Sequence, residues 1–152
     1  MERAAPAPLM LRWAAGLIDL VLLAAAGNLV GLTVLEVAEP WAGGPAALAL
    51  AAAAVVATAA AYFAVGEGRW GTTLGKLALG LRVVGEDGRP LGWRRALGRF
   101  LIRVVGTGLA GAGWWLSPGR GHGRGALPWH DALTGTRVVR WQPWRPAPEP
   151  GR

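Results

Sequence analysis

The sequence contains no cysteine, one serine (Ser117) and only two histidines (His122 and His130). Without cysteine the chain has no disulfide, no thiolate metal ligand and no cysteine nucleophile. A serine hydrolase triad or a histidine-based metal centre would have almost no residues from which to be assembled. We therefore predict that the protein is not an enzyme and that it carries no metal ion and no cofactor.

Charged residues are also scarce. They make up 16% of the 152 residues, whereas soluble domains contain about 25%. Apolar residues make up 53%, and the mean hydropathy is +0.33. A chain of this length has room for one compact domain. Because the apolar residues are clustered rather than evenly spread, the composition indicates a lipid environment.

Two long runs of the sequence are almost free of charge. The first extends over residues 9–37 and the second over residues 46–66, with a predicted turn at residues 38–45 between them. A helix needs about 20 residues to cross the hydrocarbon core of a membrane. We therefore predict an all-α membrane protein with two transmembrane helices. A cleaved signal peptide is the alternative for the first run, but Asp19 would then lie in a segment that is normally uncharged.

The chain after the second run is more polar. Residues 67–92 are rich in glycine, and we predict a short cytoplasmic turn or hairpin there, formed by two extended arms or by an interfacial helix and a turn. In a third region, residues 93–116, one helix face carries Arg95, Arg99 and Arg103. We predict an interfacial amphipathic helix that leads into a tilted or re-entrant segment. A spanning helix that draws Arg103 inward is the alternative.

The membrane domain is predicted to extend over residues 9–140. Residues 1–8 are rich in proline and alanine, and we expect a flexible N-terminus there. Residues 141–152 are rich in proline, and we expect a disordered tail.

Basic residues and tryptophans flank the apolar runs. The turn at residues 38–45 has no Lys or Arg, whereas the segment from Glu67 to Arg103 has eight and the part from Arg120 onward has six. By the positive-inside rule, the N-terminus and the middle segment face the cytoplasm. The expected partners are anionic lipid headgroups rather than nucleic acid. Six of the nine tryptophans lie at segment ends, as in an interfacial aromatic belt: Trp13, Trp41, Trp70, Trp93, Trp114 and Trp115.

Arg12 and Asp19 interrupt the first apolar run. Their seven-residue spacing places both on one helix face, about 10 Å apart along the axis. An aspartate at that depth costs a few kcal/mol unless it is protonated, hydrated or paired. One interpretation is an ion or proton site. The interpretation that we favour is a structural ion pair with an arginine of the third region, namely Arg95, Arg99 or Arg103.

Four blocks of the sequence, in this order along the chain, are similar to those of a known family. The first pairs Arg12 with Asp19 in LRWAAGLIDLVLL. The second, G-x-T-x-G-K followed by GLRVV, contains Gly71, Thr73, Gly75, Lys76, Gly80 and Arg82. The third, RALGR, contains Arg95 and Arg99. The fourth, HDALTGTRVV, contains His130, Asp131, Gly135 and Thr136. Together these blocks resemble the RDD family of small bacterial membrane proteins, which is named for one arginine and two aspartates.

This resemblance implies a multi-pass protein of the bacterial cytoplasmic membrane. Cation/proton exchange has been proposed for some members of the family. It would make Asp19 and Asp131 candidate ion or proton carboxylates, with Arg12, Arg95 and Arg99 as counter-charges, and would require a homo-oligomer to form a pathway. The alternative is a non-transporting assembly, scaffold or lipid-binding module. The third region is shorter and more basic here than is usual in the family.

Overall fold

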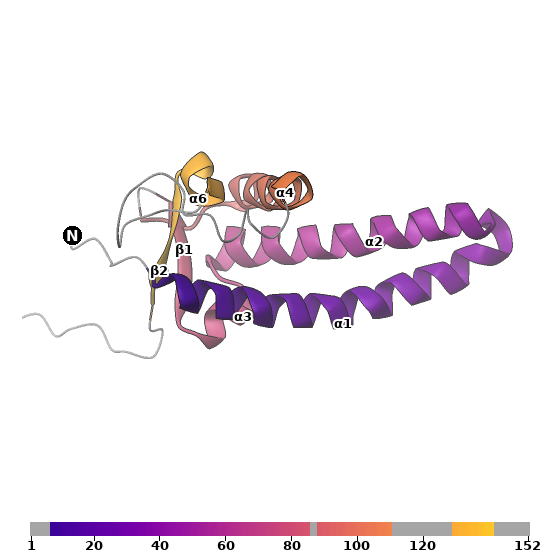
Figure 1. Cartoon of the computed structure of the whole chain (residues 1–152), viewed down its shortest axis with the longest axis horizontal. Coiled ribbons are helices and arrows are strands. Elements are labelled where there is room, and N and C mark those ends of the chain that lie inside the picture. Colours follow the sequence, from indigo (N-terminus) through magenta and orange to yellow (C-terminus); the bar gives the residue numbers. More distant parts are fainter. Residues whose placement is uncertain (1–6, 86–87, 111–128, 142–152) are drawn as a thin grey trace, which may run out of the picture.

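The computed structural model describes residues 7–85, 88–110 and 129–141. Two long helices form an antiparallel pair, and the other elements gather at the end of this pair that lies away from its turn (Figure 1). The long helices are α1 (Leu9–Ala42) and α2 (Gly44–Val65). The elements at the base are η1, a π-helical turn (Gly66–Trp70), α3 (Leu74–Ala78), β1 (Leu81–Gly85), α4 (Trp93–Ala110), α6 (Trp129–Thr134) and β2 (Thr136–Arg140).

The two predicted membrane helices are present. Helix α1, and α2 together with η1, are long and apolar enough to cross a membrane, and they are the only such helices in the described ranges. In these helices apolar side chains are exposed and a charged side chain is buried, which is the reverse of a soluble protein. Leu17 and Leu20 are each 62% exposed, whereas Asp19 between them is 1% exposed. An apolar outer surface around a buried charge is stable in lipid and unfavourable in water.

The turn between the two helices is tighter than predicted. The sequence predicted a turn over residues 38–45, but α1 continues to Ala42 and α2 begins at Gly44. Pro40 removes only one helical hydrogen bond near the end of α1, so the helix can continue past it. Gly43, with a φ of 77°, then reverses the chain in a single residue.

Gly27 and Gly31 form a G-x-x-x-G pattern in α1, and both lie at the contact with α2. A Cβ atom at Gly27 would lie 3.2 Å from one methyl of Val55 in α2, and a Cβ at Gly31 would lie 3.1 Å from the other. The missing side chains therefore let α2 approach α1 closely.

A two-stranded antiparallel sheet was not part of the all-α prediction. Strand β1 pairs with β2 so that Leu81 lies opposite Arg140 and Gly85 opposite Thr136. Strand β1 thus pairs with a strand that lies far along the chain. The described part of the segment predicted as a turn or hairpin contains helix α3 and, after β1, hydrogen bonds from the Gly88 N–H to the Gly85 carbonyl at 3.0 Å and from the Gly85 N–H to the Arg89 carbonyl at 2.9 Å. The sheet contributes Leu81, Val83 and Val138 to a small core beneath the start of α1.

Helix α4 lies across the α1–α2 pair rather than along it (Figure 1). Arg99 and Arg103 of this helix face the protein and are 1% and 7% exposed, whereas Leu101 and Val105 face outward and are 52% and 56% exposed. This crossing arrangement is closer to the predicted interfacial helix than to the alternative of a third spanning helix. Residues 111–116, which were predicted to complete the third region, lie outside the described ranges, as do residues 1–6 and 142–152 of the two predicted flexible ends.

Candidate functional site

Asp19 lies at the centre of a set of hydrogen-bond donors contributed by α2 and by the segment around α3. Its Oδ1 accepts hydrogen bonds from the Tyr62 hydroxyl at 2.6 Å and from the Gly75 backbone N–H at 2.8 Å. Its Oδ2 accepts one from the Thr73 hydroxyl at 2.6 Å and lies 3.7 Å from the Lys76 ammonium. Three donors and one cation are complementary to a carboxylate anion, and they satisfy both of its oxygens.

The partners of Asp19 correct a prediction from the sequence. We expected Arg95, Arg99 or Arg103 to pair with this carboxylate, but its contacts come instead from the G-x-T-x-G-K block and from Tyr62. The reason is the path of the backbone after η1. That path brings the start of α3 directly against α1, so that the Thr73 hydroxyl and the Gly75 N–H reach Asp19.

Gly75 makes this close approach possible. A Cβ atom at this position would lie 2.2 Å from the Ala15 carbonyl oxygen and 2.8 Å from the Asp19 Oδ1 atom. Neither neighbour can move easily, because one is helical backbone and the other is held by three hydrogen bonds. A glycine is therefore required where α3 meets α1.

Asp131, the second predicted aspartate, is fully buried and lies between two arginines. Its Oδ1 accepts a hydrogen bond from Arg99, and its Oδ2 lies 3.4 Å from Arg12. The other terminal nitrogen of Arg12 donates to the Val138 carbonyl at 3.2 Å. The hydroxyl of Thr136 donates to Asp131 at 3.4 Å. Asp131 thus joins α6 to both α1 and α4.

Glu67 is a third buried carboxylate, which the sequence interpretation did not include. It is 1% exposed. Its oxygens lie 3.0 Å from Lys76, 2.8 Å from Arg99 and 3.7 Å from Arg103. One signal could have identified it, because Glu67 is the only acidic residue between Glu39 and Glu86 and directly follows an uncharged run.

Ion-pair contacts link six residues of alternating charge into one network, which we call the charge ring because helix α1 joins its two ends. It runs from Asp19 to Lys76, Glu67, Arg99, Asp131 and Arg12, and so begins and ends on α1. Between these ends it passes through α3, η1, α4 and α6. Arg103 contacts Glu67 beside the ring. All of the base except the sheet is therefore fastened to the first membrane helix by buried ion pairs.

Burial and ion pairing act in opposite directions on the cations of the ring that lie outside the two membrane helices. Burial lowers the pKa of Lys76 because desolvation disfavours its charged form, although the Glu67 carboxylate offsets part of this effect. Burial also acts to lower the pKa of Arg99, but the charges of Asp131 and Glu67 outweigh it, and the pKa is raised. Arg99 therefore stays charged at the junction of two carboxylates.

A small cavity of about 50 Å³ lies among these side chains, with Arg12, Asp19, Arg99 and Asp131 in its lining. A water molecule needs about 10–15 Å³ of such volume, so the cavity can hold water. The Nε atoms of Arg12 and Arg99 are buried and have no hydrogen-bond partner among the described residues. Within the same part of the chain, no group of three His, Cys, Asp or Glu side chains could hold a metal ion.

The other residues singled out from the sequence lie around the ring or apart from it. Arg95 is exposed on α4 and takes no part in the ring. Gly71, Gly80 and Gly135 have positive φ values at the turns that enter or leave α3, β1 and β2. Arg82 lies over the Trp141 ring, with its guanidinium carbon 4.9 Å from the ring centroid. The backbone of His130 lies in α6, but its side chain is outside the described part of the structure.

One of three comparisons with known proteins gave a match. The model of the RDD family matches residues 6–135. A comparison with curated proteins and another with solved structures found no match. The matched residues include every member of the charge ring, from Arg12 to Asp131. Since the match covers most of the 152 residues and the chain has two helices able to span a membrane, this protein belongs to the RDD family.

Proposed function

We propose that this protein is a non-transporting membrane module, in which the charge ring holds a compact base against a two-helix membrane hairpin. The proposal rests on one observation, which is that the three buried carboxylates all have cationic partners. Asp19, Glu67 and Asp131 are each at most 1% exposed, and each contacts at least one cation. A carboxylate that exchanges ions or protons needs access to water and a weaker set of partners. The ring therefore favours an assembly, scaffold or lipid-binding role.

Cation/proton exchange is the second candidate, and the cavity beside Asp19 favours it. Its lining includes two carboxylates and three arginines, and its volume would admit water. A pathway would nevertheless need further helices, since two spans enclose little space, so this candidate implies a homo-oligomer.

Flux measurements separate the two candidates. We expect proteoliposomes that contain the wild-type protein to show no more cation/proton exchange than empty liposomes. Asp19→Asn removes the charge that faces Lys76, so it should lower the free energy of unfolding by about 2 kcal/mol, which can be measured by denaturation in detergent. Exchange by the wild type that disappears in Asp19→Asn, with unchanged stability, would support transport instead.

The proposal includes an orientation in the bacterial cytoplasmic membrane. The excess of basic residues at the base supports a cytoplasmic N-terminus and base, with the α1–α2 turn outside. The chain has no cysteine, so single cysteines can report on this directly. We expect a membrane-impermeant maleimide added to intact cells to label Gly44→Cys and not Arg95→Cys. The reverse pattern would show that the orientation is wrong.

A further inference from the structure

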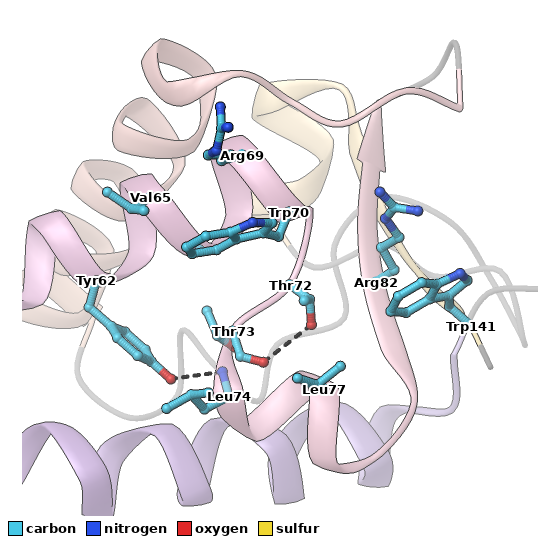
Figure 2. Close-up of a pocket in the computed structure, with 11 residues that line it drawn as sticks. Tyr62, Val65, Arg69, Trp70, Thr72, Thr73, Leu74, Leu77, Arg82 and Trp141 are labelled. Carbon is cyan, nitrogen blue, oxygen red and sulfur yellow. Dashed lines mark hydrogen bonds between the residues drawn. The ribbon is translucent and has the colours of Figure 1, made fainter. Parts of the chain in front are cut away.

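A second pocket, of about 470 Å³, lies at the base of α2 and is separate from the charge ring (Figure 2). Tyr62 and Leu74 lie at one end of it, and Arg82 and Trp141 lie at the other. The Tyr62 hydroxyl is not available to a ligand, because it donates to Asp19 and accepts a hydrogen bond from the Leu74 N–H at 3.0 Å. The pocket thus combines an apolar end with a cationic end.

The apolar walls of this pocket continue the surface of a membrane helix. Tyr62 and Val65, in the last turn of α2, line it together with Trp70 of η1. Trp70 is 57% exposed and Leu74 is 56% exposed. Large apolar and indole side chains exposed directly after a membrane helix lie at the level where acyl chains meet headgroups. The pocket is therefore open to lipid at this level.

The cations at this pocket differ from those of the ring because they have no carboxylate partner within residues 7–85, 88–110 and 129–141. Neither Arg69 nor Arg82 forms an ion pair with any residue that the structure describes. The Nε atom of Arg82 is buried and has no hydrogen-bond partner there. The Arg82 guanidinium carbon lies 4.9 Å from the Trp141 ring centroid, and such a contact with an aromatic face does not use the N–H groups as hydrogen-bond donors. A planar guanidinium edge matches the oxygens of a phosphate group.

We propose that this pocket binds one anionic phospholipid of the surrounding leaflet. Arg82 would donate hydrogen bonds to the lipid phosphate, Arg69 would add positive charge at the rim, and an acyl chain would lie against Leu74 and Leu77. The inference rests on the proposed function, because it gives the module a specific lipid to hold. Basic pockets beside membrane helices are suited to anionic headgroups.

Retention of lipid by the purified protein tests the site. The full chain is extracted in a mild detergent and exchanged with phosphatidylglycerol or phosphatidylcholine, and bound lipid is counted by native mass spectrometry. We expect the wild type to prefer phosphatidylglycerol about tenfold, or about 1.4 kcal/mol. Arg82→Gln should lose this preference. Arg95→Gln removes the same charge from an exposed position outside the pocket and should retain it. Arg82→Lys, which keeps the charge but lacks the planar edge, should show a reduced preference.

Several outcomes would overturn the lipid site. If Arg82→Gln and Arg95→Gln lose the preference for phosphatidylglycerol equally, the attraction comes from a diffuse basic surface. If neither variant loses this preference, Arg82 has no role in lipid binding. Displacement of the lipid by millimolar inorganic phosphate would identify a free anion as the ligand. If Arg82→Gln does not fold, Arg82→Lys becomes the test. A preference of Arg82→Lys for phosphatidylglycerol as strong as that of the wild type would count against the proposed geometry. The lipid-retention assay and the flux assay are independent. The lipid site can therefore be disproved while the protein still shows no cation/proton exchange, and exchange can be detected while the lipid site is confirmed.

Discussion

Replacement of Gly75 with alanine is expected to destabilise the protein by about 3 kcal/mol or more. The new Cβ would lie 2.2 Å from the Ala15 carbonyl oxygen, so α3 would have to move away from α1. Overpacking of this kind costs about 1–3 kcal/mol. The movement would also break the hydrogen bond from the Gly75 N–H to Asp19, and a bond to a charged group contributes about 1.5–3 kcal/mol.

Denaturation of the purified protein in detergent measures this loss, and Gly98→Ala is the matched control. Gly98 lies in α4, and a Cβ atom there would have no neighbour within 4 Å. Alanine in a helix is more favourable than glycine by up to about 1 kcal/mol, so the control should be as stable as the wild type or more stable. Equal stability of Gly75→Ala and the wild type would show that α3 does not contact α1 as described.

Glu67→Gln is expected to cost about 3–5 kcal/mol, the range for removing one partner of a buried ion pair. Glutamine has nearly the same shape as glutamate but no charge. Three cations contact Glu67, and Arg99 would keep only Asp131 as a counter-charge. The excess positive charge would then have to be hydrated, which requires the base to loosen.

The same denaturation assay applies to this variant, with Glu36→Gln as its control. Glu36 is exposed on α1, away from the ring, so its neutralisation should change the free energy of unfolding by less than about 0.5 kcal/mol. A similar, small effect of both substitutions would mean that Glu67 is hydrated rather than ion-paired, and the ring would be incomplete.

Some features of the fold could be predicted because their cause is local. A predominantly apolar run of membrane length forms a helix in lipid whatever else the chain does, so residues 9–37 and 46–66 were placed nearly correctly. The turn was placed less well, because the range predicted for it, residues 38–45, is helical as far as Ala42 and again from Gly44. The strand pair was missed because Val83 and Val138 are adjacent only in the folded protein, and no local pattern records that pairing.

In the candidate site too, the features that depend on local spacing could be predicted, and those that depend on contacts between distant segments could not. The spacing of Arg12 and Asp19 placed both on one face, and both line the same cavity. Their partners could not be derived from spacing, because Asp19 is reached by a backbone N–H at Gly75 and Asp131 by arginines of two helices. Glu67 could not be identified from spacing, because its cationic partners come from α3 and α4. An acidic residue at the end of an uncharged run, within a basic segment, is the signal to seek in similar chains.

Hydrogen–deuterium exchange of Glu67→Gln tests the charge ring most directly, because exchange reports each segment separately. If the ring couples the base to α1, the substitution in η1 should accelerate exchange in α3, α4 and α6, while residues 20–55 of the α1–α2 pair keep the wild-type rate. Faster exchange confined to η1, with α6 unchanged, would contradict the account, since Asp131 would then be held independently of Glu67.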